Sequence, residues 1–135
     1  CTGTVCHLEA DMIQSALGDW RTPELDFLFI ENVGNLVCPA TYDLGEALRL
    51  VLCSVTEGED KPLKYPTIFN TADVAVITKM DLAEIVEFDR AAAHQNIQSV
   101  RPGMQVLEVS AKSEDGMDDW IETLFSKFTS RIDTK

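Results

Sequence analysis

The sequence lacks the features that mark membrane and secreted proteins. No apolar run approaches the roughly 18 residues that a membrane-spanning helix needs. The first residues carry no basic group ahead of an apolar stretch, so no signal peptide is visible. The 4 cysteines form no CxxC pair, which excludes a zinc ribbon and a thioredoxin-type redox motif. We therefore expect reduced thiols, a cytoplasmic location and no membrane partner.

Basic residues are also scarce. The 135 residues include 11 Lys and Arg against 23 Asp and Glu, which gives a net charge of −12. A surface of this sign repels phosphate backbones, so we expect no nucleic-acid partner. The hydrophobic share of 45% and the charged share of 25% are those of a globular chain rather than a disordered one.

Short apolar runs alternate with amphipathic stretches along the chain. The runs at residues 27–30, 48–55, 74–77 and 106–109 predict strands buried on both faces of a parallel sheet. Apolar residues at helical spacing predict helices over residues 8–17, 84–100 and 117–128. The two prolines at 62 and 66 predict a loop with a short helix. This alternation favours a doubly wound α/β sheet with no internal domain boundary.

The residues that follow the third run carry a recognisable pattern. In open α/β sheets, ligands bind beyond the carboxyl ends of the strands. Thr78, Lys79 and Asp81 lie there and match the [NT]KxD pattern that reads guanine. The Asp81 carboxylate can accept both N1–H and N2–H of guanine, which adenine does not offer in that geometry. The Lys79 stem would pack on the base.

Two further elements follow other runs. Ser110, Ala111 and Lys112 form an SAK element, whose backbone N–H meets guanine O6. Glu31 and Gly34 form an ExxG element, in which the carboxylate would serve Mg²⁺ and the glycine amide the γ-phosphate. Each pattern alone is also that of an ordinary turn. Because all three come in order after an apolar run, we predict a GTPase-type base pocket.

The phosphate-binding loop GxxxxGK[ST] does not occur in the 135 residues. That loop supplies the backbone amides, the lysine and the hydroxyl that hold phosphates and Mg²⁺. We therefore expect weak GTP binding and no useful hydrolysis by this chain alone. Because the sequence begins at Cys1 rather than at a methionine, we expect the loop to precede Cys1 in the natural protein.

Another group of residues combines sulfur and nitrogen ligands. Cys6 and His7 begin the first helical stretch, and Cys38 follows the first apolar run. Two thiolates and one imidazole suit Zn²⁺, or Ni²⁺ where planar geometry is allowed. Buried structural cysteines and an ordinary histidine are the alternative interpretation. We interpret Cys53, which lies within the second run, as a core residue.

Several segments resemble one family. Residues 6–10 (CHLEA) and 31–40 (ENVGNLVCPA) look like the hydrogenase-maturation nickel-incorporation GTPases of the HypB type. Residues 54–58 (SVTEG), 60–66 (DKPLKYP) and 78–82 (TKMDL) are similar to the same family. The resemblance runs from the first residues to the last helical stretch, and the ENVGNLVCPA segment is its most specific part.

The resemblance implies a GTPase that helps to deliver nickel to the large subunit of [NiFe]-hydrogenase. It implies a nickel or zinc site made by Cys6, His7 and Cys38. It also implies nucleotide-dependent homodimerisation near the metal and an accessory maturation factor as partner. Two departures stand out: Thr78 replaces the family's common Asn, and Asp11 lies where some members place a histidine, which puts a second metal site in doubt.

We therefore expect one GTPase-type domain over residues 1–135, the C-terminal portion of a G domain without its phosphate loop. Its fold is expected to be α/β, P-loop NTPase-like (SIMIBI-type), with three layers, a mostly parallel sheet and an N-terminal truncation. GTP or GDP, with Mg²⁺ in the intact protein, would be the nucleotide ligands. Two alternatives stay open: another metal-chaperone GTPase of the same fold, and a catalytically silent module for interaction or dimerisation.

Overall fold

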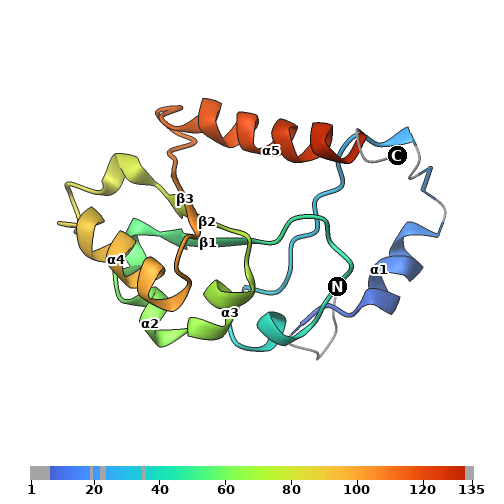
Figure 1. The fold of residues 1–135 in the computed structure, drawn as a ribbon, viewed down its shortest axis with the longest axis horizontal. Coiled ribbons are helices and arrows are strands. Elements are labelled where there is room, and N and C mark those ends of the chain that lie inside the picture. The colour runs from blue at the N-terminus through green and yellow to red at the C-terminus, as the bar shows by residue number, and fades with distance from the viewer. Residues whose placement is uncertain (1–6, 19, 22–23, 35, 133–135) are drawn as a thin grey trace. The chain divides into compact units, whose positions relative to one another are not determined.

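The computed structural model describes residues 7–18, 20–21, 24–34 and 36–132, with side chains left undescribed at 41 and 128–132 (Figure 1). The chain divides into two compact units, residues 1–47 and residues 48–135. Each unit is described by itself.

Residues 48–135 contain a three-stranded parallel sheet. Strands β1 (Leu50–Ser54), β2 (Val74–Thr78) and β3 (Gln105–Glu108) lie in the order β1-β2-β3. The register pairs Ser54 with Thr78 and Ile77 with Glu108, so the three strands end at one edge. Three of the four predicted strands and their parallel arrangement are confirmed.

Helices cover both faces of this sheet (Figure 1). One face carries α2 (Lys61–Lys64), α3 (Pro66–Thr71) and α4 (Arg90–Val100), and the other carries α5 (Met117–Ile132). Pro62 is the second residue of α2 and Pro66 the first of α3, and a proline is tolerated in the first turn because the N–H groups there have no helical partner. The stretch predicted to be a loop with one short helix therefore forms two.

The side chains of β2 alternate between two apolar clusters. Ala75 and Ile77 pack with Ile97 of α4, whereas Val74 and Val76 pack in the cluster that Trp120 of α5 contacts. Because successive residues of a strand point to opposite faces, a continuous apolar run is required when both faces are covered. The run at residues 74–77 meets that requirement.

Helix α4 begins later than predicted. The amphipathic pattern predicts a helix from residue 84, but the chain turns until Asp89. Glu87 has a left-handed backbone (φ 53°), which an α-helix cannot contain. Asp89 then caps the helix, and its Oδ1 accepts a hydrogen bond from the N–H of Ala92 at 2.9 Å.

Residues 1–47 contain helix α1 (Ala10–Leu17) and the short 3-10 helix η2 (Cys38–Thr41). The prediction of a strand at 27–30 is wrong, since the structure assigns none there. A strand needs neighbouring strands to pair its backbone groups, and the described sheet consists of β1, β2 and β3 alone. The side chains of Leu28 and Phe29 remain 43% and 67% exposed.

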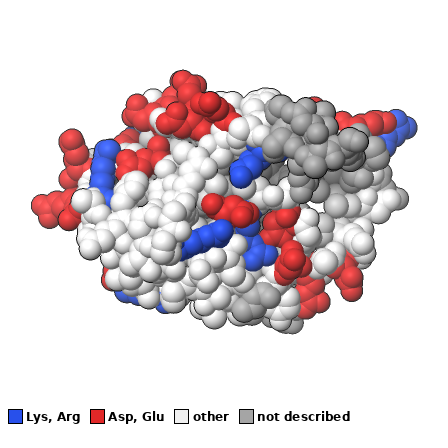
Figure 2. All heavy atoms as spheres, in the orientation of Figure 1, with Lys and Arg blue, Asp and Glu red and all other residues white. Residues whose placement is uncertain are grey.

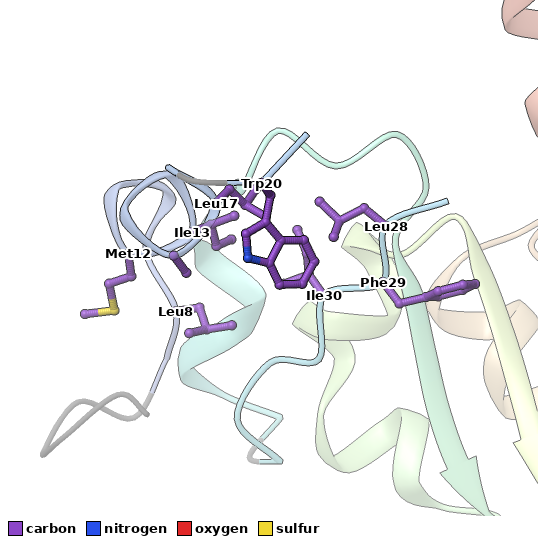
Figure 3. A pocket seen from close by; sticks show the side chains of 9 residues that line it. Leu8, Met12, Ile13, Leu17, Trp20, Leu28, Phe29 and Ile30 are labelled. Atoms are coloured by element: carbon purple, nitrogen blue, oxygen red, sulfur yellow. The ribbon is translucent and has the colours of Figure 1, made fainter. Parts of the chain in front are cut away.

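An apolar pocket of about 420 Å³ lies between α1 and residues 28–30 (Figure 3). The predicted amphipathic pattern of α1 is confirmed, because its apolar residues line the pocket. The lining residues are Leu8, Met12, Ile13, Ala16, Leu17, Trp20, Leu28, Phe29 and Ile30.

Acidic side chains are the more abundant charged groups over the face drawn in Figure 2, with basic side chains interleaved among them. Across the described part of the chain, no helix combines the length and the apolar character needed to cross a membrane.

Candidate functional site

The predicted guanine-reading pattern lies directly at the end of β2. Thr78 is the last residue of the strand, and its Oγ1 donates to the Cys53 carbonyl of β1 at 3.5 Å. Lys79 follows with a left-handed backbone (φ 61°, ψ 40°), uncommon for a residue with a side chain. This conformation turns the chain into the 3-10 helix η4 (Met80–Leu82), which carries half-buried Asp81.

Asp81 and the SAK element are brought together. The Oγ of Ser110 donates to Oδ1 of Asp81 at 2.7 Å, and the N–H of Met80 donates to the carbonyl of Val109 at 3.2 Å. Ser110 is fully buried, and its Oγ accepts from the N–H of Ser113 at 3.2 Å. A carboxylate offers about four acceptor positions. Asp81 can therefore accept from Ser110 and still accept from two N–H groups of a base.

Hydrogen bonds among residues 110–115 close the SAK loop. The N–H of Ser110 donates to the Asp115 carbonyl at 2.9 Å, and Ser113 Oγ donates to Oδ2 of Asp115 at 2.6 Å. Ala111 and Lys112 lie exposed at the tip of the loop. The motif therefore presents a loop of defined shape beside Asp81.

Gly116 completes this closure, and the motif analysis gave it no role. Its backbone is left-handed (φ 71°), and a Cβ at this position would lie 2.0 Å from the Glu108 carbonyl oxygen. Only glycine allows that approach. The available signal was its place between the SAK element and the last predicted helix.

Glu57 is a further residue at this edge to which the sequence analysis gave no role. It ends the 3-10 helix η3 (Val55–Glu57) after β1, accepts from the N–H of Ser54 at 3.0 Å and pairs with Lys61. Burial alone would raise its pKa, but hydrogen bonds from Lys61 and Ser54 and the charges of Lys61 and Lys79 lower it. The signal for this arrangement was the capping-box pattern SxxE at residues 54–57.

The predicted metal-binding residues lie in residues 1–47. His7 is buried, with 9% of its surface exposed, and its ring stacks on Tyr42 at a centroid distance of 3.7 Å and an angle of 11°. Tyr42 directly follows η2, which begins at half-buried Cys38. The stack therefore holds His7 against the segment that carries Cys38. Cys6 lies outside the described residues.

A second contact connects the segment that carries His7 and Leu8 to the ExxG turn at residues 31–34. Oδ1 of Asn32 accepts from the N–H of Leu8 at 3.0 Å and from the N–H of Val33 at 2.8 Å. Glu31 and Gly34 are exposed on either side of it. Asn32 lies within the segment ENVGNLVCPA, but no single-residue signal marks it as a bridge.

Of the three predicted metal ligands, the structure describes His7 and Cys38. Among the described residues, no three His, Cys, Asp or Glu side chains gather closely enough to hold a metal ion. The imidazole and thiol of His7 and Cys38 are donor types that suit nickel and zinc.

Comparison with known proteins places the chain in a family. Residues 1–108 match the family CobW/HypB/UreG, nucleotide-binding domain. The chain belongs to this family. It is 50% identical over 120 residues to the hydrogenase maturation factor HypB of Azotobacter vinelandii, covering 89% of this chain and 40% of that protein. It is 42% identical over 130 residues to the hydrogenase/urease maturation factor HypB of Helicobacter pylori, covering 93% of this chain and 54% of that protein.

Solved structures of this family have the same fold. The crystal structure of HypB from Helicobacter pylori in complex with nickel matches with a TM-score of 0.91 and 41% identity, over 96% of this chain and 62% of that one. HypB from Archaeoglobus fulgidus matches with a TM-score of 0.88 and 41% identity, over 95% and 62%. The predicted HypB resemblance and P-loop NTPase-like α/β fold are confirmed. The chain spans about half or less of the length of these curated relatives.

Proposed function

We propose that this chain is the base-reading and metal-carrying part of a GTP-dependent metallochaperone that delivers nickel during [NiFe]-hydrogenase maturation. Thr78, Lys79 and Asp81 would read guanine together with the SAK loop, and Glu31 and Gly34 would serve Mg²⁺ and the γ-phosphate in the intact protein. The hydrogenase large subunit and an accessory maturation factor would be its partners, and a homodimer its working form.

One observation carries the nucleotide half of this proposal. The 2.7 Å hydrogen bond from Ser110 to Asp81 joins two patterns that lie 29 residues apart in the sequence. A buried hydroxyl that donates to a carboxylate fixes the carboxylate before a ligand arrives, which lowers the entropy lost on binding. The pocket is therefore preorganised for a base that offers two adjacent N–H donors.

The metal half rests on the family and on the surroundings of His7. The Helicobacter relative was solved in complex with nickel. In this chain, the stack between His7 and Tyr42 brings an imidazole to the segment of Cys38. Cys6, His7 and Cys38 would form a three-ligand site with an open position, and such a site can release its cargo more readily than a closed site with four ligands.

The segment from Glu31 to Cys38 would couple the two halves. Asn32 already connects it to the backbone beside His7. If GTP orders this segment in the intact protein, the position of Cys38 relative to His7 changes with the nucleotide state. Identical nickel affinity with GDP and with a non-hydrolysable GTP analogue in the full-length protein would contradict this coupling.

Asp81→Asn tests the nucleotide half. Xanthine carries a carbonyl at C2 where guanine carries an amine, so the amide of the variant should favour xanthine nucleotides over guanine nucleotides. Titration of the unmodified chain and of the variant with fluorescent GDP and XDP measures the preference. Unchanged base preference would exclude this pocket, and no binding of GTP, GDP, Ni²⁺ or Zn²⁺ by the unmodified chain would favour the silent-module alternative.

Cys38→Ala tests the metal half. Removal of one thiolate should weaken Ni²⁺ and Zn²⁺ binding at least about tenfold, or about 1.4 kcal/mol. Isothermal titration with each metal measures the change. Cys53→Ala is the matched control, because Cys53 is a buried core thiol of β1. Equal affinity in the Cys38 variant and the unmodified chain would exclude Cys38 as a ligand.

A further inference from the structure

The imidazole of His7 is held by two neighbours that no sequence pattern marks. Its Nε2 lies 3.1 Å from Oε1 of Glu9, and its ring lies flat against Tyr42. One neighbour contacts the edge of the ring and the other contacts its face. Together they define both the position and the plane of a group that the proposed function uses as a metal ligand.

The contact with Glu9 favours one tautomer of a neutral His7. An ionised carboxylate only accepts hydrogen bonds, so Nε2 is the nitrogen that carries the proton. In a neutral imidazole the lone pair then lies on Nδ1. Histidines that bind metals commonly donate their other N–H to a carboxylate, which fixes the tautomer and the ring orientation.

Glu9 is directed to His7 rather than to its own helix. It occupies the N-cap position of α1, with an extended backbone (φ −116°, ψ 154°), yet its side chain makes no capping hydrogen bond. Side chains at N-cap positions commonly accept from the helix N–H groups. The carboxylate of Glu9 instead contacts the imidazole two residues earlier.

Tyr42 sets the plane of the ring. At 3.7 Å and 11° the two rings are nearly parallel, and Tyr42 is itself fixed by η2, since its N–H donates to the Pro39 carbonyl at 3.5 Å. The ring plane of His7 therefore depends on the turn that begins at Cys38. A change in that turn would rotate or release the imidazole.

We propose that Glu9 and Tyr42 are positioning residues for His7: Glu9 holds Nε2–H so that a divalent metal ion is bound through Nδ1, and Tyr42 aligns the ring with the Cys38 turn. This inference rests on the proposed metal site and adds to it the nitrogen that binds and the two side chains that present it.

Nitrogen-15 NMR of the imidazoles tests the role of Glu9 in the complete chain. The chain has only 2 histidines, so His94 serves as the internal reference and H94N assigns the signals. The metal-free protein should show His7 as the Nε2–H tautomer, and added Zn²⁺ should shift Nδ1 far more than Nε2. E9Q, whose amide can also donate, should mix the tautomers and lower Ni²⁺ affinity about tenfold. A larger shift at Nε2 would overturn the assignment.

Two substitutions separate the ring of Tyr42 from its hydroxyl. Y42F keeps the aromatic face and should retain the Ni²⁺ affinity and the ring-current shift of the His7 protons. Y42L removes the face and should abolish that shift and weaken Ni²⁺ binding about two- to tenfold. Y65L is the matched control, since Tyr65 is the chain's other tyrosine and lies between α2 and α3.

The outcomes distinguish this inference from the proposed function. Metal binding that is unchanged in E9Q and Y42L would overturn the positioning roles and leave the metal site in place. Equal loss in Y42F and Y42L would overturn the role of the ring. Failure of the unmodified chain to bind Ni²⁺ or Zn²⁺ would overturn both the metal site and the positioning roles.

Discussion

The two units of the chain are built in different ways. In residues 48–135, both faces of a parallel sheet are covered by helices, and fully buried residues such as Phe69, Ile77 and Ile97 form its core. In the described part of residues 1–47, the buried residues are His7, Pro39 and Ala40. The edge that carries Asp81 and Ser110, which we propose reads the base, is therefore supported by a core, whereas the segment around His7 is held by individual side-chain contacts.

This difference bears on how each candidate site can respond to a ligand. A close-packed core resists displacement of the groups that it supports, so Asp81 and Ser110 stay in place. A segment with few buried apolar groups opens at lower free energy. The segment around His7 is therefore the one whose geometry can change in the loading and release of an ion that we propose.

Gly116→Ala is expected to have the largest effect on stability. It lies in residues 48–135, the unit with the buried core. The new Cβ would meet the Glu108 carbonyl oxygen at 2.0 Å in a left-handed backbone. Strain and overpacking together should cost about 3 kcal/mol or more. Gly103→Ala is the control, because its backbone is also left-handed but its Cβ would meet nothing within 4 Å. Urea unfolding followed by circular dichroism should show a much larger loss for Gly116; equal losses would contradict the close approach.

A pair of truncations compares the two units directly. Ile97→Ala removes a fully buried side chain from α4 and should cost about 2–5 kcal/mol. Leu17→Ala removes a half-buried side chain from α1 and should cost about 1 kcal/mol or less. Amide hydrogen exchange should show faster exchange across the sheet in the first variant and only around α1 in the second. If the two substitutions lowered the free energy of unfolding by similar amounts, the proposed difference in packing between the two units would be wrong.

The smallest effect at neutral pH is expected from the ionisation of Cys53, which should appear as a dependence of stability on pH. Burial, with a contribution from Glu57 that Lys61 partly opposes, raises the pKa of this thiol from 9.0 to about 11. Because the unfolded thiol ionises near pH 9 and the folded thiol does not, stability should decrease as the pH rises from about 9 towards 11. Thermal melts of the unmodified chain and of Cys53→Ala should differ in that range. Parallel pH profiles would contradict the burial of Cys53.

Much of the sheet edge that we propose reads the base could be predicted from the sequence. The runs at 48–55, 74–77 and 106–109 each contain a strand, and the continuous apolar run of the central strand β2 reflects burial on both of its faces. The patterns at 78–81 and 110–112 follow them directly, so the parallel order of the strands was enough to bring the patterns together. The contact between Ser110 and Asp81 was not predicted, since it depends on the closure that Gly116 allows.

The predictions for residues 1–47 were less successful, for a physical reason. An apolar run indicates burial but does not supply a partner strand, so the run at 27–30 was mistaken for a strand. The stack between His7 and Tyr42 joins residues 35 positions apart without a periodic pattern. Contacts of this kind depend on tertiary geometry, and neither Glu9 nor Tyr42 belongs to a motif with a fixed chemical meaning.

The paired registers of the sheet fix how far each loop of the proposed base pocket lies from its strand. Thr78 is aligned with Ser54, and Ile77 with Glu108, so the distance from each strand to its loop is counted in residues along the ladder. One residue inserted into β2 would send Asp81 to the opposite side of the sheet. Extra residues between α2 and α3, or after α4, would leave that count unchanged, so variation in length within homologues is expected there rather than inside the strands.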